Sequence, residues 1–311
     1  MKFFDKIKDY FLEQPAPHSA FQISSRYLSG MHVSPKERKI KGHFILPLER
    51  GVIQPSFIHK NIKNASLLEK YVKEGLEKLH LTDRKIACLI PELSLKAFVF
   101  SFESLPSSRN EREHIIRFRI KKQVPLLPDD ARISFERINS SHSEKLLAAV
   151  AGASVIQEYE DFFHRFHLKV GLISIPTLCL YSMIARDKEE DLILLNVEED
   201  FLSLVVIVNS EIALYRLKPF ALDPHAELTL DQKVRNIIRE VENTVNFIED
   251  RERKKVNSLW IRLAVLESED EMFDALQENL PLRIRSIEER SATQLEGKKK
   301  IILSPLIGQV L

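Results

Sequence analysis

The chain has 311 residues, of which 44% are hydrophobic and 29% are charged, and its formal net charge at pH 7 is +1. This composition is typical of a folded protein and excludes disorder over most of the length. The near-zero net charge gives no general reason to expect nucleic acid or an anionic membrane as a partner. The length suits two lobes of roughly 150 residues each.

Glycine is scarce in this chain. Its eight glycines are scattered, and no G-x-G-x-x-G or G-x-x-x-x-G-K-[ST] loop is present. Such loops use glycine so that backbone N–H groups can approach a phosphate closely. The sequence therefore excludes the usual dinucleotide-binding and P-loop functions.

The two cysteines, Cys88 and Cys179, both lie inside apolar segments. A free cysteine in such a segment behaves as a small buried hydrophobe, so we expect two unpaired thiols in a reducing cytoplasm. A disulfide between them is the less favoured alternative, because disulfides form mainly in oxidising compartments. His164 and His167 are three residues apart, but no matching cysteine or carboxylate set accompanies them, so no metal site is expected.

Residues 1–84 are predicted to form an N-terminal amphipathic helix and a first lobe. Apolar residues of segment 2–13 are spaced along one helix face and do not form the continuous run of a signal peptide. This face either packs on the protein or lies on a membrane, with its lysines meeting anionic lipid. Three strand-like segments (20–25, 26–34 and 38–48) follow, and then a helix over 66–79 with Ser66 as its cap.

Residues 85–187 are predicted to form a compact α+β unit with a connecting helix. The expected order is strand, strand, helix, strand, strand, helix, strand and helix, over segments 85–91, 95–102, 110–123, 131–138, 145–153, 155–166, 168–175 and 177–185. The helix over 110–123 should end before Pro125, because the residue before proline resists the helical region. Phe98, Phe100 and Phe102 alternate along one strand and should lie beneath that helix.

Residues 188–311 are predicted to form a second lobe. Segment 192–220 should form three strands (192–197, 201–208 and 211–217), with Glu198, Glu199 and Asp200 in the first turn. A long helix over 230–250 comes next, followed by strand 259–266, helix 269–280 and strand 282–287. Three strands followed by helix, strand, helix and strand is the ordering of an actin-like lobe, and the first lobe looks like a shorter version of it.

Several segments together resemble the PilM family of actin-like proteins of type IV pilus assembly, which is related to the cell-division protein FtsA and to the L component of type II secretion. They are residues 46–79, 90–106, 110–138, 146–184 and 234–250. The resemblance implies a bilobed α/β fold of the actin-like (ASKHA) type. Two mixed sheets flanked by helices would form the lobes, with 85–187 as an inserted α+β subdomain.

The resemblance also locates three degraded nucleotide-binding positions. Ser24 and Ser25 stand in the turn where the family has an aspartate and a glycine. Asn196 and Glu199 stand in the matching turn of the second lobe, and Ala264 stands where a glycine pair would contact adenosine. These departures imply a pseudo-ATPase without a cofactor.

For function, the resemblance implies a non-catalytic scaffold of a pilus or secretion apparatus, located in the cytoplasm at the inner-membrane face. It would hold a short apolar peptide from the cytoplasmic tail of a bitopic inner-membrane protein, between the first lobe and the subdomain. Contact with the assembly motor ATPase and homo-oligomerisation are further expectations.

The alternative is an ATP-binding actin-like ATPase of the same machinery, in which Glu198, Glu199 and Asp200 hold Mg²⁺. A solvated acidic turn is the favoured interpretation of these three carboxylates. A sugar-kinase-like enzyme of the same fold would need a catalytic base, which the sequence does not offer.

A cluster of cations makes the helix after Asn110 basic: Arg112, Arg117, Arg119, Lys121 and Lys122. Most such runs form a solvated helix face. The functional alternative is a docking surface for an acidic partner, since the guanidinium fork suits carboxylates. Nucleic acid is the less favoured partner, because the cations are not interleaved with a series of aromatic stacking platforms.

Overall fold

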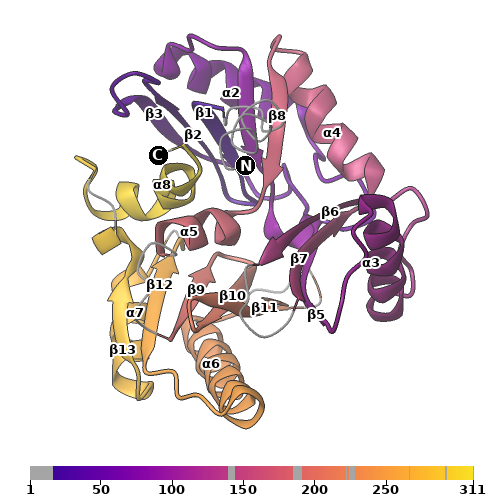
Figure 1. The fold of residues 1–311 in the computed structure, drawn as a ribbon. Coiled ribbons are helices and arrows are strands. Elements are labelled where there is room, and N and C mark those ends of the chain that lie inside the picture. Colours follow the sequence, from indigo (N-terminus) through magenta and orange to yellow (C-terminus); the bar gives the residue numbers. More distant parts are fainter. Residues whose placement is uncertain are drawn as a thin grey trace.

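The computed structural model describes residues 17–138, 144–184, 191–221, 223, 228–265, 267–290 and 293–310. It contains two five-stranded sheets, one above the other in Figure 1, and a three-stranded sheet at their side. The helix predicted over residues 2–13 lies outside the described residues. No helix within the described parts of the chain is long and apolar enough to cross a membrane.

The first sheet has the strand order β3-β2-β1-β4-β8. Its strands are β1 (Ser19–Ile23), β2 (Tyr27–Val33), β3 (Ile40–Pro47), β4 (Lys85–Leu89) and β8 (Lys169–Ser174). β1, β2 and β3 form an antiparallel meander, whereas β4 pairs with β1, and β8 with β4, in parallel. Helices α2 (Ala65–Leu79) and α4 (Ala153–His164) supply core residues to one face of this sheet, together with Phe21 and Ile23 of β1.

The second sheet repeats this plan with the order β11-β10-β9-β12-β13. Its strands are β9 (Leu192–Val197), β10 (Phe201–Val208), β11 (Glu211–Pro219), β12 (Ser258–Leu263) and β13 (Arg283–Ser286). Helices α6 (Leu230–Glu252) and α7 (Glu269–Asn279) pack on one face. The three strands predicted within 192–220 and the long helix after them are therefore confirmed.

The third sheet, β5-β7-β6, forms the subdomain at the right of Figure 1. It consists of β5 (Lys96–Phe102), β6 (Arg132–Ile138) and β7 (Glu144–Ala151), covered by α3 (Arg109–Gln123). Phe100 and Phe102 are buried in its core, and Phe98 packs against them, as predicted.

Strand pairing groups the middle of the chain differently from the sequence analysis. β4 and β8, which were expected in one compact unit over 85–187, belong to the first sheet, where β4 pairs with β1 and β8 pairs with β4. Parallel strands are joined by crossovers, so the chain leaves the first sheet after β4, builds the subdomain and returns. The order of strands along the chain does not reveal which of them pair.

Two helices lie between the two large sheets (Figure 1): α5 (Pro176–Ile184) and α8 (Gly297–Val310). Both supply residues to the core on the second face of the first sheet, including Cys179 and Leu303. They approach so closely that a Cβ on Gly308 would lie 2.1 Å from the Cys179 carbonyl oxygen. Glycine is therefore required at this crossing.

Two local predictions concern caps and cysteines. The cap of α2 is Asn64, whose side chain accepts a hydrogen bond from the Leu67 N–H, and the predicted cap Ser66 lies inside the helix. Asparagine and serine are both good N-cap residues, and Asn64 takes this role because the helix begins directly after it.

Cys88 and Cys179 are buried and unpaired, as predicted.

Candidate functional site

The first candidate region is the centre of the molecule, where the β1–β2 turn of the first sheet meets the β9–β10 turn of the second. We call five buried polar residues here the interlobe cluster: Gln22, Tyr27, Asn196, Glu198 and Arg262. They come from β1, β2, β9, the turn after β9 and β12. The cluster therefore joins both lobes through side chains.

Arg262 is the hub of the interlobe cluster. Its side chain is 0% exposed, and it donates five hydrogen bonds, which is the full capacity of a guanidinium group. Nη1 donates to Glu198 Oε1 at 3.0 Å and to Asn196 Oδ1 at 2.7 Å, while Nη2 donates to the Tyr27 hydroxyl at 2.8 Å. The other acceptors are the carbonyl oxygens of Ile301 and Ile302 in α8, at 2.9 and 3.1 Å.

Glu198 is the anionic partner of Arg262. Besides Arg262, Gln22 donates to Glu198 Oε1 at 3.0 Å, and the Tyr27 hydroxyl donates to the same oxygen at 2.9 Å. Burial raises the pKa of Glu198, and the Arg262 guanidinium opposes that rise. Burial also raises the pKa of Tyr27, so the phenol stays neutral and can donate.

The expectation of a solvated acidic turn is wrong for Glu198, which is only 4% exposed. A charge this deeply buried requires a partner, and Arg262 supplies it from a strand distant in sequence. Glu199 is half-buried and pairs with Lys233 of α6 at 2.5 Å. The two neighbouring carboxylates, Glu198 and Glu199, therefore each pair with a different cation.

A second buried carboxylate, Glu92, lies beside the interlobe cluster. It belongs to the short turn η1 (Glu92–Ser94) and accepts a hydrogen bond from the Tyr215 hydroxyl at 2.8 Å. Asn196 Nδ2 lies 3.5 Å from Glu92 Oε2 and 3.0 Å from Thr177 Oγ1, so Asn196 links the two groups of residues. Burial raises the pKa of Glu92 to about 7.

The structure places the other predicted nucleotide positions in structural roles. Ser24 is buried, and its hydroxyl closes the β1–β2 turn by accepting from the N–H groups of Arg26 and Tyr27. Ser25, in the same turn, is half-buried. Ala264 is buried, and its N–H donates to the Val197 carbonyl at 2.8 Å. Among these positions only Asn196 enters the interlobe cluster.

Sequence reasoning missed the roles of Gln22, Tyr27, Glu92 and Arg262. Arg262 carries a signal that was available: it is the one charge inside the strand SLWIRL, all of which is buried. A charged residue in a fully buried strand needs an ion-pair or hydrogen-bond partner. Nothing local to the other three residues indicates that they meet.

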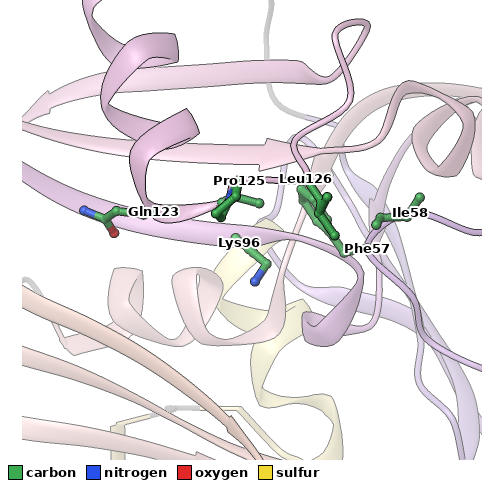
Figure 2. Close-up of a pocket in the computed structure, with 7 residues that line it drawn as sticks. Phe57, Ile58, Lys96, Gln123, Pro125 and Leu126 are labelled. Atoms are coloured by element: carbon green, nitrogen blue, oxygen red, sulfur yellow. The ribbon is translucent and has the colours of Figure 1, made fainter.

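The second candidate region is the subdomain pocket, which has a volume of about 320 Å³ (Figure 2). Its lining comes from the loop after β3, the start of β5 and the end of α3: Phe57, Ile58, Lys96, Gln123, Val124, Pro125 and Leu126. Lys96 Nζ lies 5.6 Å from the centroid of the Phe57 ring. The pocket is therefore largely apolar and lies where the first lobe meets the subdomain.

The five predicted partner-binding cations divide into two groups. Arg112 donates to the Pro106 and Ser107 carbonyls, and Arg117 donates to the Asp129 and Ala131 carbonyls, so both fasten α3 to its flanking loops. Arg119, Lys121 and Lys122 are exposed. No three His, Cys, Asp or Glu side chains among the residues that the structure describes gather so as to hold a metal ion.

Comparison with known proteins gives structural likeness only. No family model matches this chain, and no curated protein matches it. A structure described as a PilM-PilN type IV pilus biogenesis complex matches with a TM-score of 0.73 at 12% identity, over 95% of this chain and 98% of that chain. A Bacteroides thetaiotaomicron protein with an actin-like ATPase fold and unknown function matches at 0.54 and 8%, over 93% and 94%.

The chain has an actin-like fold. A third match is the cytoplasmic domain of EpsL, an inner-membrane component of the type II secretion system of Vibrio cholerae, with a TM-score of 0.51 at 8% identity over 93% of this chain and 94% of that chain. The predicted fold class and the predicted likeness to PilM in fold are thus confirmed. At these identities the likeness establishes the fold alone.

Proposed function

We propose that this chain is a cytoplasmic scaffold of type IV pilus or related secretion machinery. In this proposal it works at the inner-membrane face and holds the cytoplasmic tail of an inner-membrane assembly partner in the subdomain pocket. It does so without turning over ATP. The proposal has two parts, tail binding and the lack of nucleotide chemistry, which rest on different residues.

The fold and the printed descriptions of its neighbours support the choice of machinery. One neighbour is a complex of PilM with PilN, and another is the cytoplasmic domain of an inner-membrane secretion component. The first description concerns pilus biogenesis, and the second concerns an inner-membrane component of a secretion system. A protein with this fold that holds a membrane partner's tail is consistent with both.

The subdomain pocket supports tail binding. Five of its seven lining residues are apolar, and they come from two parts of the fold that are distant in sequence. A cavity of about 320 Å³ accommodates a few apolar side chains of a short peptide. Ile58 and Leu126 are 40% and 79% exposed, so a bound peptide would cover apolar surface that now faces water.

The ion pair between Glu198 and Arg262 is the observation that carries the second part. In actin-like proteins that use nucleotide, the family resemblance assigns phosphate binding to the two turns that here flank the interlobe cluster, and this pair is bonded to Gln22 and Tyr27 beside the first of them. A phosphate entering between the turns would have to break the five hydrogen bonds of Arg262 and would then meet the Glu198 carboxylate. Both effects oppose the binding of a polyphosphate.

Isothermal calorimetry with two titrants tests both parts. Peptides of candidate cytoplasmic tails are expected to bind, whereas Mg-ATP is expected to release no heat of binding. Ile58→Asp should weaken tail binding, and Leu172→Asp on β8 is the matched control because the two side chains are 40% and 39% exposed. Equal tail affinity in both variants would remove the pocket from the proposal, and micromolar Mg-ATP binding would remove the second part.

A further inference from the structure

The outer face of α3 combines exposed cations with an exposed aromatic ring. We call Phe118, Arg119, Lys121 and Lys122 the basic ridge. Phe118 is 60% exposed, although it is a large apolar side chain, and the three cations around it are also exposed. From Arg117 to Lys122 the helix carries four cations and no carboxylate.

Helical spacing places Phe118 at the middle of this face. Lys122 is one turn further along, and its Nζ lies 4.4 Å from the centroid of the Phe118 ring. Lys121 lies on the other side and forms an exposed ion pair with Asp129 at 2.9 Å. Ile116 and Ile120 on the opposite face are fully buried in the subdomain core, so α3 is held with its basic ridge outward.

We propose that the basic ridge binds the surface of a bilayer containing anionic phospholipids. Lysine and arginine near such a surface each contribute about 1 kcal/mol of attraction. A phenylalanine beside them suits the interface, where apolar side chains insert at the boundary between headgroups and acyl chains. Phe118 and its neighbouring lysines supply both elements on a single exposed surface.

Two observations favour a bilayer over an acidic protein as the occupant. The ridge is the convex outside of a helix, whereas the concave apolar surface nearby belongs to the subdomain pocket. Phe118, 60% exposed, lies on the basic ridge and is not among the residues that line the subdomain pocket. Charge combined with a protruding apolar side chain fits a deformable lipid surface, which closes around it.

Vesicle co-sedimentation of the full chain tests the inference. Vesicles of phosphatidylcholine with phosphatidylglycerol are compared with vesicles of phosphatidylcholine alone, at low and at high salt. We expect binding only to the anionic vesicles, and we expect it to weaken with salt because exposed charges are screened. No peptide is present, so the result is independent of tail binding.

Two variants with matched controls locate the contact. Neutralising Lys121 and Lys122 to glutamine should weaken binding by roughly 30-fold, given about 1 kcal/mol for each lysine. Neutralising Lys70 and Lys73, exposed on α2, changes the net charge equally and should have a much smaller effect. Phe118→Ser should weaken binding more than Leu172→Ser does, and circular dichroism should show all variants to be folded.

Three outcomes would overturn the inference. One is failure of the full chain to bind anionic vesicles. Another is an equal loss of binding in the α2 and α3 lysine variants, which would mean that only net charge matters. The third is unchanged binding in both basic-ridge variants. This result would place the lipid contact elsewhere, as in the membrane role considered for segment 2–13, or leave the ridge for an acidic protein.

Discussion

Replacing Arg262 with methionine should destabilise this protein more than any ordinary surface change. Methionine fills much of the same space but removes five donors from a fully buried site. Glu198 then loses its cation, and the Ile301 and Ile302 carbonyls each lose one donor. Breaking a buried ion pair by removing one partner costs about 3–5 kcal/mol, a large share of a typical stability of about 5–15 kcal/mol.

Urea denaturation at pH 7 measures this loss as a change in the free energy of unfolding. Arg132→Met is the matched control, because Arg132 pairs with Glu160 at 2.9 Å but both side chains are substantially exposed. Such a surface pair contributes about 0–1 kcal/mol. An Arg262→Met loss no larger than that of the control would refute the view that the interlobe cluster joins the lobes.

A double-mutant cycle assigns the loss to the ion pair. Glu198→Leu alone leaves Arg262 charged and buried, whereas the double variant removes both charges. The double variant should therefore lose at least about 2 kcal/mol less than the sum of the two single losses. Losses that add within about 0.5 kcal/mol would mean that the two residues act independently.

The pH dependence of the stability loss in Arg262→Met tests whether Arg262 lowers the pKa of Glu198. Burial raises the pKa of Glu198, and Arg262 opposes the rise, so removing Arg262 should raise this pKa further. A carboxyl with a raised pKa in the folded state stabilises the fold fully below its unfolded pKa, and this contribution is lost as pH rises through the folded value. The deficit of Arg262→Met relative to the native chain should accordingly be smaller at pH 5 than at pH 8.

Three further predictions concern other sites. Burial raises the pKa of Glu92 from 4.5 to about 7. The contribution of Glu92 to stability should therefore fall by about 2–3 kcal/mol between pH 5 and pH 8. If urea denaturation gave a Glu92→Gln variant the same pH slope as the native chain, this prediction would be contradicted. Gly308→Ala should lower the unfolding free energy by about 1–3 kcal/mol because α5 and α8 must separate, whereas a thermal midpoint at or above the native value would show that the crossing tolerates a Cβ. Asn64→Ala should cost about 1 kcal/mol through loss of the α2 cap, and Ser66→Ala should cost much less.

Local patterns predict most of this fold because they reflect local physics. The apolar runs bounded by polar turns in 192–220 became β9, β10 and β11, and the apolar face of 230–250 became the buried face of α6. Pairing partners could not be predicted in this way. β4 lies beside β1 and β8 rather than beside β5, its neighbour in sequence, because parallel pairing is set by the packing of crossovers.

The candidate site was predictable only in part, and the reason is similar. Asn196, near the end of β9, and Glu198, in the turn after it, were identified by their positions, but their environment depends on residues from other elements. Glu198 became a buried ion-pair partner because Arg262 reaches it from β12, 64 residues away in sequence. From sequence alone an acidic turn is predicted to be solvated unless a distant cation is known to reach it. The isolated arginine in the buried strand SLWIRL indicated such a cation.

The interlobe cluster also bears on how the proposed scaffold would hold its partner. Separating the lobes would break the contacts of Tyr27 of the first lobe with Arg262 and Glu198 of the second. The subdomain is tied to the second lobe as well, by Glu92 with Tyr215 and by a partly buried ion pair of Lys145 with Glu211 at 3.3 Å.

Entry of a nucleotide between the lobes would require them to separate, and these contacts oppose such a separation. A scaffold gains from the same contacts, because the subdomain pocket and the basic ridge then keep a fixed spacing. Arg262→Met should therefore loosen the subdomain as well as the interlobe centre, with faster amide hydrogen exchange in β5 and in α3. Faster exchange confined to the strands β2, β9 and β12 would instead show that the subdomain is held independently of the lobes.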